Sequence, residues 1–308
     1  MRNVLLKFCL IVAAVLTLVA GLDIVLGKTM DNLLSRVGSV GQLGKTNYAI
    51  HEIDAPILVV GSSRASHHYD SRMLTDSLKI KTYNIGRDGC LFTHNACIIN
   101  TILDRYAPYA IIWEFNPSYL CDSEDTVTSL YPYYGELDYI TETLNSELPY
   151  NERVKLHSNI YRYNSIFLRI LMRCIQKNSS SDPSLGYELL PPKTLITPLV
   201  LSSIDSRNQT FDERRMLRLK RTLDYAKSKG VKMILITSPM YGVIQDSRSF
   251  DKLAEICASA GALYFDNTQL YLDKPEYFND LTHMNCLGAE QYTKEIIYTI
   301  KDALCEHQ

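Results

Sequence analysis

A short apolar run that ends in a small, hydroxyl-rich turn constrains this chain most. Ile57 to Val60 are four consecutive aliphatic residues, which is typical of a fully buried strand. Gly61, Ser62 and Ser63 follow directly. In α/β proteins a strand of the central sheet ends in this way, and the chain turns into a helix at the carboxyl edge, where sites form. The pattern predicts either a nucleophile at Ser63, where helix N–H groups would face a developing oxyanion, or simply a serine N-cap.

The rest of the chain repeats the same alternation of strand and helix. Repeated alternation predicts an α/β fold with a mostly parallel sheet and helices on both faces. The further strands are expected at 79–85, 109–115, 231–237 and 262–265, and the helices at 67–78, 90–106, 210–229, 250–260 and from about 288 to 304.

Composition excludes several classes of protein. The formal net charge of the 308 residues is -2 and there is no basic run, so we expect no nucleic-acid partner. The eight cysteines are scattered, without a CxxC pair or zinc-like spacing, which indicates neither a disulfide framework nor a metal site.

The N-terminal segment predicts a membrane anchor. Val4 to Leu26 is apolar except for Lys7 and Asp23, and it reaches the length of about 20 residues that a span needs. We expect a transmembrane signal-anchor at 1–27, an amphipathic stalk or a first helix followed by a loop at 28–53, and the catalytic domain at 54–308. The early positive charges of Arg2 and Lys7 predict a periplasmic or extracellular domain. A cleaved signal peptide and a buried soluble helix are the alternatives.

Residues 118–209 do not follow the alternation. A structureless loop of that length is improbable in a compact domain, so we expect a helical insertion, or lid, with its best helix at 151–175. The insertion is rich in tyrosine, which suits stacking on a sugar. Packing of these tyrosines in the insertion's own small core is the alternative.

The second half of a catalytic constellation comes late in the chain. Asp280 and His283 are three residues apart in a loop before the last helix. This spacing lets the carboxylate bind one imidazole nitrogen while the other faces the crevice, as in the base and orienting residue of a serine triad. Gly89 and Asn116 follow the second and third strands, where an N–H group and a side-chain amide can face an anion.

With these blocks in order, the chain resembles the SGNH hydrolases, also called GDSL esterases or lipases. Gly61-Ser62-Ser63 resembles the Gly-Asp-Ser block with Ser62 in place of Asp, and Asn84 to Gly89 resembles the second block. Only Asn116 of the segment 114–117 matches the Gly-x-Asn-Asp block, whereas Asp280 to His283 matches the last block fully.

The resemblance implies a flavodoxin-like three-layer α/β/α fold without metal or organic cofactor. It also implies that Ser63, His283 and Asp280 are catalytic, with the N–H groups of Ser63 and Gly89 and the amide of Asn116 as the oxyanion hole. For Arg64 and Glu114 two interpretations stay open, namely substrate binding and a structural ion pair. Three further histidines have no expected partner and are interpreted as bystanders: His67, His68 and His94.

The favoured function is a serine esterase or O-acyltransferase acting on O-acetyl groups of a cell-envelope or extracellular glycan. Membrane-anchored relatives of this kind resemble accessory proteins of alginate O-acetylation and teichoic-acid D-alanylation, which implies an acyl-donating membrane partner. A catalytically silent glycan-binding module is the alternative. An apolar lipase fits poorly, because the insertion is polar.

Overall fold

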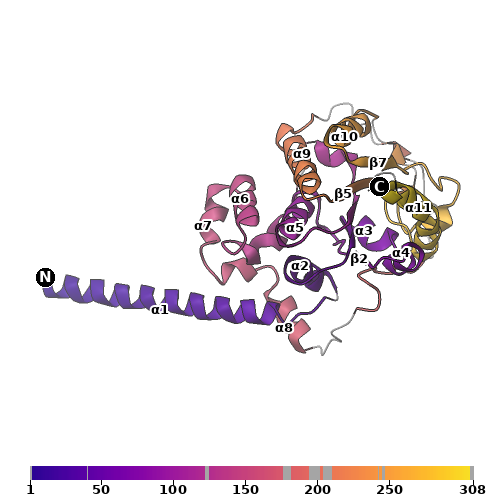
Figure 1. Cartoon of the computed structure of the whole chain (residues 1–308). Coiled ribbons are helices and arrows are strands. Elements are labelled where there is room, and N and C mark those ends of the chain that lie inside the picture. The colour runs from indigo at the N-terminus through magenta and orange to yellow at the C-terminus, as the bar shows by residue number, and fades with distance from the viewer. Residues whose placement is uncertain are drawn as a thin grey trace. The chain divides into compact units, whose positions relative to one another are not determined.

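The computed structural model divides the chain into two compact units (Figure 1). The smaller unit comprises Met1–Gly38 and Thr128–Ser179, and the larger comprises Ser39–Val127 and Ser180–Gln308. The structure describes residues 2–39, 41–121, 125–175, 182–193, 202–203, 210–241, 243–244 and 247–305.

A parallel sheet forms the centre of the larger unit. Among the described residues it has five strands in the order β2-β1-β3-β5-β7. Because β2 and β3 pair with opposite sides of β1, the chain reverses direction across the sheet there, and such switch points are where α/β proteins bind ligands. The strands are β1 (Ile57–Val60), β2 (Thr82–Asn84), β3 (Ala110–Glu114), β5 (Lys232–Thr237) and β7 (Leu263–Asp266), and a separate pair is β4 (Ser202–Ser203) and β6 (Val243–Ile244).

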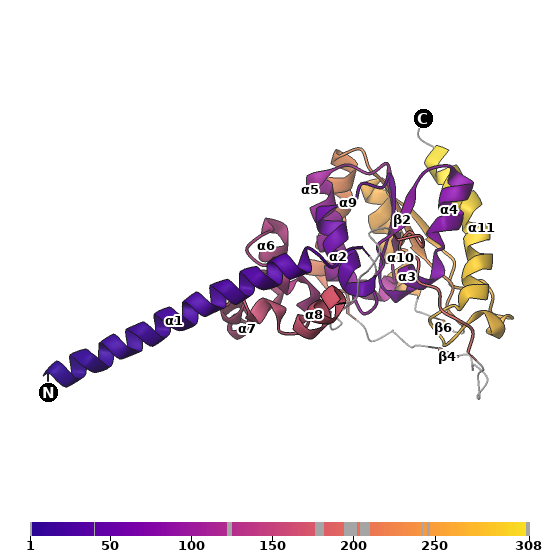
Figure 2. The same ribbon diagram turned by 90° about the horizontal axis from the view of Figure 1, so that it is seen from below.

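Helices cover both faces of this sheet (Figure 2). One layer consists of α3 (Ser63–His68), α4 (Ser71–Leu78) and α11 (Cys286–Cys305). The other consists of α2 (Gly41–His51), α5 (Phe92–Arg105), α9 (Glu213–Ser228) and α10 (Ser247–Ala260). Two 3-10 turns, η1 (Pro117–Leu120) and η4 (Pro275–Tyr277), complete the described elements of this unit. The predicted three-layer α/β fold is thus confirmed, and the strands β1, β2 and β3 are buried along their whole length, as expected for strands covered on both faces.

Of the two expectations for 28–53, the structure contains a helix followed by a loop rather than a stalk. The N-terminal helix continues to Leu34, and α2 belongs to the larger unit, where Lys45, Ala49 and Ile50 are buried. The larger unit therefore begins near Ser39 rather than at residue 54. Burial of one face of α2 against α5 explains the difference, because this segment has a packing partner that a stalk lacks.

The smaller unit is helical and differs from the expected insertion at 118–209. It combines α1 (Arg2–Leu34) with η2 (Thr128–Tyr133), α6 (Asp138–Glu147), α7 (Tyr150–Lys155), η3 (Tyr161–Tyr163) and α8 (Phe167–Ile175). Most of its tyrosines are buried, which agrees with the interpretation that they pack in the insertion's own core rather than stack on a sugar. The buried ones are Tyr131, Tyr133, Tyr134 and Tyr163.

The single helix predicted at 151–175 is divided in two. The carboxylate of Asp23 on α1 accepts hydrogen bonds from the backbone N–H groups of Asn159 (2.8 Å) and Ile160 (3.1 Å) and from Ser158 Oγ (2.6 Å). These N–H groups are consequently unavailable to helix carbonyls, and the chain turns between α7 and α8. Helical periodicity alone does not reveal such a distant partner.

Helix α1 is long and apolar enough to cross a membrane. Its most apolar 18-residue window has no buried residue, whereas Gly27, Met30 and Leu34 near its C-terminus are buried. A signal sequence has the same properties, so the span and the cleaved signal peptide are both compatible with this helix.

Candidate active site

Ser63 is the first residue of α3, directly after the end of β1. Gly61 makes the turn with a φ of +151°, and a Cβ at this position would lie 2.9 Å from the carbonyl oxygen of Glu114 on β3. Only glycine tolerates this approach, so the close packing of β1 and β3 sets where the serine emerges. Ser63 is half-buried.

Three predicted residues meet at this point. His283 Nε2 lies 2.7 Å from Ser63 Oγ, although the two residues are 220 positions apart in the chain. On the other side of the ring, His283 Nδ1 lies 3.0 and 2.9 Å from the two carboxylate oxygens of Asp280. The contacts have the order nucleophile, base and orienting acid that a serine triad requires. Their catalytic role stays a prediction.

The carboxylate of Asp280 fixes which imidazole nitrogen carries the proton. Burial acts to raise the pKa of Asp280, but hydrogen bonds from His283 and from the N–H of Thr282 (2.8 Å) outweigh it and hold the pKa well below its usual range. An ionised carboxylate only accepts hydrogen bonds, so Nδ1 of His283 donates to it. Nε2 is then unprotonated in the neutral ring and accepts the proton of the Ser63 hydroxyl.

Backbone contacts hold the loop that carries these two residues. Asn279 N donates to His283 O (2.8 Å), and Phe278 pairs with Met284 in an isolated antiparallel bridge. Tyr241 N, which follows β5, donates to Leu281 O (2.9 Å). The loop is thus closed at its base and attached to the sheet, which limits the positions that His283 can take.

His68 joins this loop to α3, the helix that begins at Ser63. Its Nε2 accepts the N–H of Met284, next to His283, at 2.9 Å. Its Nδ1 therefore carries the proton and donates to Ser238 Oγ at 2.7 Å. His68 is fully buried, and burial, together with the charges of Arg64 and His283, holds its pKa well below 6.5. The sequence-based interpretation of His68 as a bystander is wrong, because the ring is a structural link.

Gly89 and Asn116 follow the strands on either side of β1. Carboxyl ends of neighbouring parallel strands share one sheet edge, so the loops of Ser63, Gly89 and Asn116 begin along the same edge. Gly89 is exposed with a φ of +69°. Asn116 Oδ1 accepts the N–H of Ser118 (3.1 Å), which orients the amide and directs its NH2 group elsewhere.

A buried lysine from α2 supports the loop before Gly89, and sequence reasoning missed it. Lys45 Nζ donates to Ser66 Oγ on α3 and to Gly86 O, both at 3.1 Å, and lies 2.9 Å from a carboxylate oxygen of Glu188. Burial lowers the pKa of Lys45 while Glu188 acts to raise it. A Cβ at Gly86 would lie 2.5 Å from the Ser66 nitrogen, so loop and helix touch. The sequence pattern of 28–53 gave no indication that this lysine is buried.

Arg64, the residue after Ser63, forms a buried ion pair with Glu114. The guanidinium of Arg64 donates to one carboxylate oxygen of Glu114, while Tyr69 OH and the N–H of Ser238 donate to the other. Arg64 and Glu114 are only 5% and 2% exposed. Such burial does not agree with substrate binding by Arg64 and Glu114. The other interpretation, a structural ion pair, describes these two residues.

His67 lies at the rim of the site beside His283. The two rings are 6.4 Å apart and meet edge to face. His67 Nδ1 contacts Glu188 O at 2.7 Å, and Nε2 lies 3.4 Å from an oxygen of Asp88. Burial acts to lower the pKa of His67, but these acceptors outweigh it and raise the pKa. The sequence-based interpretation of His67 as a bystander did not predict these polar contacts beside His283. His94 is buried on α5.

Comparisons with known proteins add little to this geometry. No protein-family model and no curated protein matches the chain. Among solved structures, it is similar to a lipase/acylhydrolase from Enterococcus faecalis, with a TM-score of 0.39 and 15% identity over 82% of this chain and 98% of that chain. Because the TM-score is below 0.5, the functional conclusion rests on the contacts of Ser63.

Replacing Glu114 by glutamine is expected to destabilise the larger unit by about 3–5 kcal/mol, because it leaves the charge of Arg64 buried without a partner. The measurement is urea unfolding of the detergent-solubilised chain, followed by the fluorescence of its one tryptophan, Trp113 on β3. The double variant Arg64→Met/Glu114→Leu is the control and should lose less. A loss below about 0.5 kcal/mol in Glu114→Gln, as at an ordinary surface site, would contradict the buried pair.

The buried histidines predict a stability that falls in acid. His68 and His94 have pKa values well below 6.5, since burial disfavours their charged forms. Below about pH 6.5 the unfolded chain binds protons that the native chain excludes, so the free energy of unfolding falls by about 1.4 kcal/mol per pH unit for each group. In His68→Asn, the free energy of unfolding should depend less steeply on pH than in the wild-type chain, by the contribution of one histidine. Equal slopes would show that His68 titrates normally. The raised pKa of His67 acts in the opposite direction but cancels in this comparison.

Proposed function

We propose that this chain is a serine esterase or O-acyltransferase that uses Ser63, His283 and Asp280 as its triad. The observation that carries the proposal is the 2.7 Å contact between Ser63 Oγ and His283 Nε2, with the carboxylate of Asp280 bound to the opposite ring nitrogen. A serine that only capped the helix would need neither His283 nor Asp280.

The first half of the reaction transfers an acyl group to the protein. Ser63 Oγ attacks the carbonyl carbon of an ester while His283 Nε2 takes the hydroxyl proton, and Asp280 stabilises the imidazolium that forms. Collapse of the tetrahedral intermediate breaks the bond to the leaving alkoxide, which receives the proton from His283. The acyl group is then bound to Ser63 Oγ.

The oxyanion of the intermediate needs donors that are already in place. The backbone N–H of Ser63 lies at the start of α3, where N–H groups have no partner within the helix. In the proposal, the N–H of Gly89 and the amide of Asn116 supply the remaining donors from the flanking strands. Such donors act most strongly where the charge develops.

The second half regenerates the serine. An acceptor hydroxyl loses its proton to His283 as its oxygen attacks the acyl carbon, and Ser63 leaves with that proton. Water as acceptor makes the protein a hydrolase, and a sugar hydroxyl makes it an acyltransferase. Both reactions use the same residues.

We propose O-acetyl groups of a cell-envelope or extracellular glycan as the substrate. The groups around the base are polar, namely His67, Asp88 and Thr282. A polar rim favours a hydrated glycan over a long acyl chain. In this proposal α1 anchors the chain with its larger unit in the periplasm or outside the cell, beside a membrane partner that donates acyl groups.

Hydrolysis of p-nitrophenyl acetate tests the reaction class. We expect turnover by the wild-type chain and a loss of at least about 10⁴-fold in kcat for Ser63→Ala and His283→Ala, as expected when a member of a triad is removed. Ser259→Ala on α10 is the matched control, because its hydroxyl bonds within its own helix to Ile256 O. Equal turnover by Ser63→Ala and wild type would reject the serine mechanism.

Asn116→Ala is expected to lower kcat by about 100- to 1000-fold with little change in KM, because a donor to the oxyanion acts in the transition state. The assay is steady-state hydrolysis of the same ester. Asn267→Ala serves as the control, since Asn267 also follows a strand but donates to Tyr292 OH instead. A KM effect without a kcat effect would assign Asn116 to ground-state binding.

A further inference from the structure

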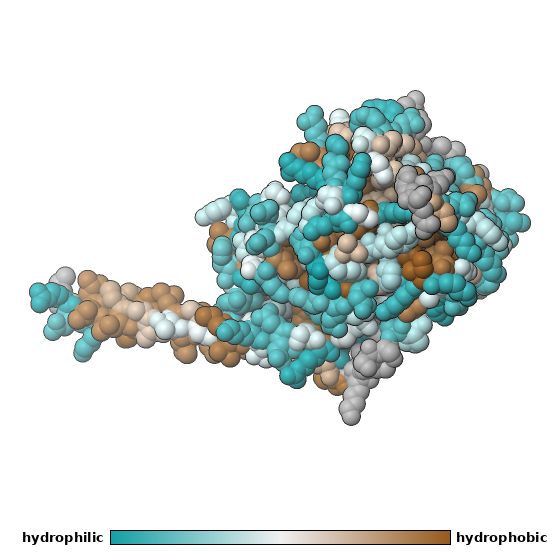
Figure 3. Space-filling view, in the orientation of Figure 1, coloured by the Kyte–Doolittle hydropathy of each residue, from teal (hydrophilic) through white to brown (hydrophobic). Residues whose placement is uncertain are grey.

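The exposed apolar surface of α1 ends where the rest of the smaller unit begins. Side chains from Val4 to Leu26 are largely exposed, and they form the apolar band along this helix in Figure 3. At 1.5 Å per residue this band is about 35 Å long, which matches the bilayer's hydrocarbon core of about 30 Å. Gly27 is the first buried residue of the helix.

The segment 158–174 packs beside this boundary. Asp23 is bound by Ser158, Asn159 and Ile160, and Cys174 Sγ contacts Leu33 O at 3.5 Å. The segment therefore begins level with the end of the apolar band and extends about 10 Å past Leu26. A headgroup layer is about 5–7 Å thick on each side of a bilayer, so the segment covers its depth.

Helix α8, which belongs to this segment, presents an apolar stripe. Leu168, Met172 and Ile175 are spaced like one face of a helix and are 68, 57 and 82% exposed, while Ile170 on another face is buried. A globular protein rarely leaves such a stripe in water. Arg169 and Arg173 on the same helix, together with the exposed Lys28 on α1, add positive charge.

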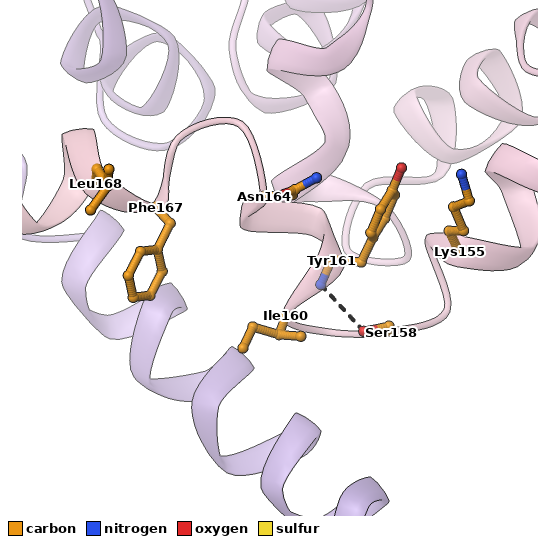
Figure 4. Close-up of a pocket in the computed structure, with 7 residues that line it drawn as sticks. All are labelled: Lys155, Ser158, Ile160, Tyr161, Asn164, Phe167 and Leu168. Atoms are coloured by element: carbon orange, nitrogen blue, oxygen red, sulfur yellow. Dashed lines mark hydrogen bonds between the residues drawn. The ribbon is translucent and has the colours of Figure 1, made fainter.

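A pocket of about 600 Å³ opens beside the stripe and is amphipathic (Figure 4). Phe167 and Leu168 line one end, and Ile160 lies between them and the polar end. At that end Lys155 Nζ donates to a carboxylate oxygen of Glu152 at 2.7 Å, and Tyr161 OH donates to the other at 2.8 Å. Through Phe167 and Leu168 the pocket extends the apolar surface of α8.

We infer that α8 and this pocket form a lipid-binding surface that lies on an anionic bilayer where α1 leaves it. The inference rests on the proposed anchoring by α1. Continuity with the apolar band of α1 and the charges of Arg169, Arg173 and Lys28 select the bilayer as the occupant. Basic amphipathic helices lie in the headgroup region in this way.

Tryptophan fluorescence of the full chain in vesicles of phosphatidylcholine and phosphatidylglycerol tests the inference. The variants are Phe167→Trp and Met172→Trp, with wild type as the blank because its one tryptophan, Trp113, is buried. The emission of the added tryptophan should shift to shorter wavelength in the vesicles. Brominated phospholipids should quench this emission. Glu142→Trp, on the exposed face of α6 in the same unit, should respond to aqueous iodide instead.

Flotation of the vesicles separates this inference from the proposed anchor. Failure to float would overturn the anchor. A chain that floats can still overturn the lipid-binding surface. It does so if iodide quenches the added tryptophan of Phe167→Trp and Met172→Trp as strongly as that of Glu142→Trp, and if brominated lipid quenches neither Phe167→Trp nor Met172→Trp. Replacing phosphatidylglycerol by phosphatidylcholine, or introducing Arg169→Glu and Arg173→Glu, should weaken the lipid quenching. Unchanged quenching would refute the role of the two arginines.

Discussion

The site depends on one buried imidazole that connects two distant parts of the chain. His68 accepts the N–H of Met284 and donates to Ser238, so the helix of Ser63, the loop of His283 and the end of β5 meet on a single ring. An imidazolium donates from both nitrogens and cannot accept the N–H of Met284. The geometry of Ser63 and His283 therefore requires that His68 be neutral, and burial provides that.

Buried charges fix the surroundings of Ser63 in the same way. Glu114 holds Arg64, the residue after Ser63, and Lys45 holds α3 to the loop before Gly89. Each contact joins α3 to a different strand end or loop. A substitution at one of them leaves a buried group without its partner, which costs more than the net worth of the contact. The position of Ser63 is thus determined from several sides.

The sequence predicted the parts of the molecule that local pattern controls. Apolar runs and glycine turns located the sheet strands within a few residues, and the spacing of Asp280 and His283 indicated their mutual contact. The start of the larger unit and the long helix at 151–175 were mispredicted because burial of Lys45 and the capture of two N–H groups by Asp23 depend on distant segments. The same reason explains why the link through His68 could not be foreseen.

The central claim is that His283 activates Ser63 as a nucleophile. Treatment of the folded chain with a fluorophosphonate, followed by peptide mass spectrometry, tests it without knowledge of the natural substrate. The account predicts phosphonylation at Ser63 in the wild-type chain and none in His283→Ala. A folded wild-type chain without the adduct, or equal labelling of the wild-type chain and His283→Ala, would contradict it.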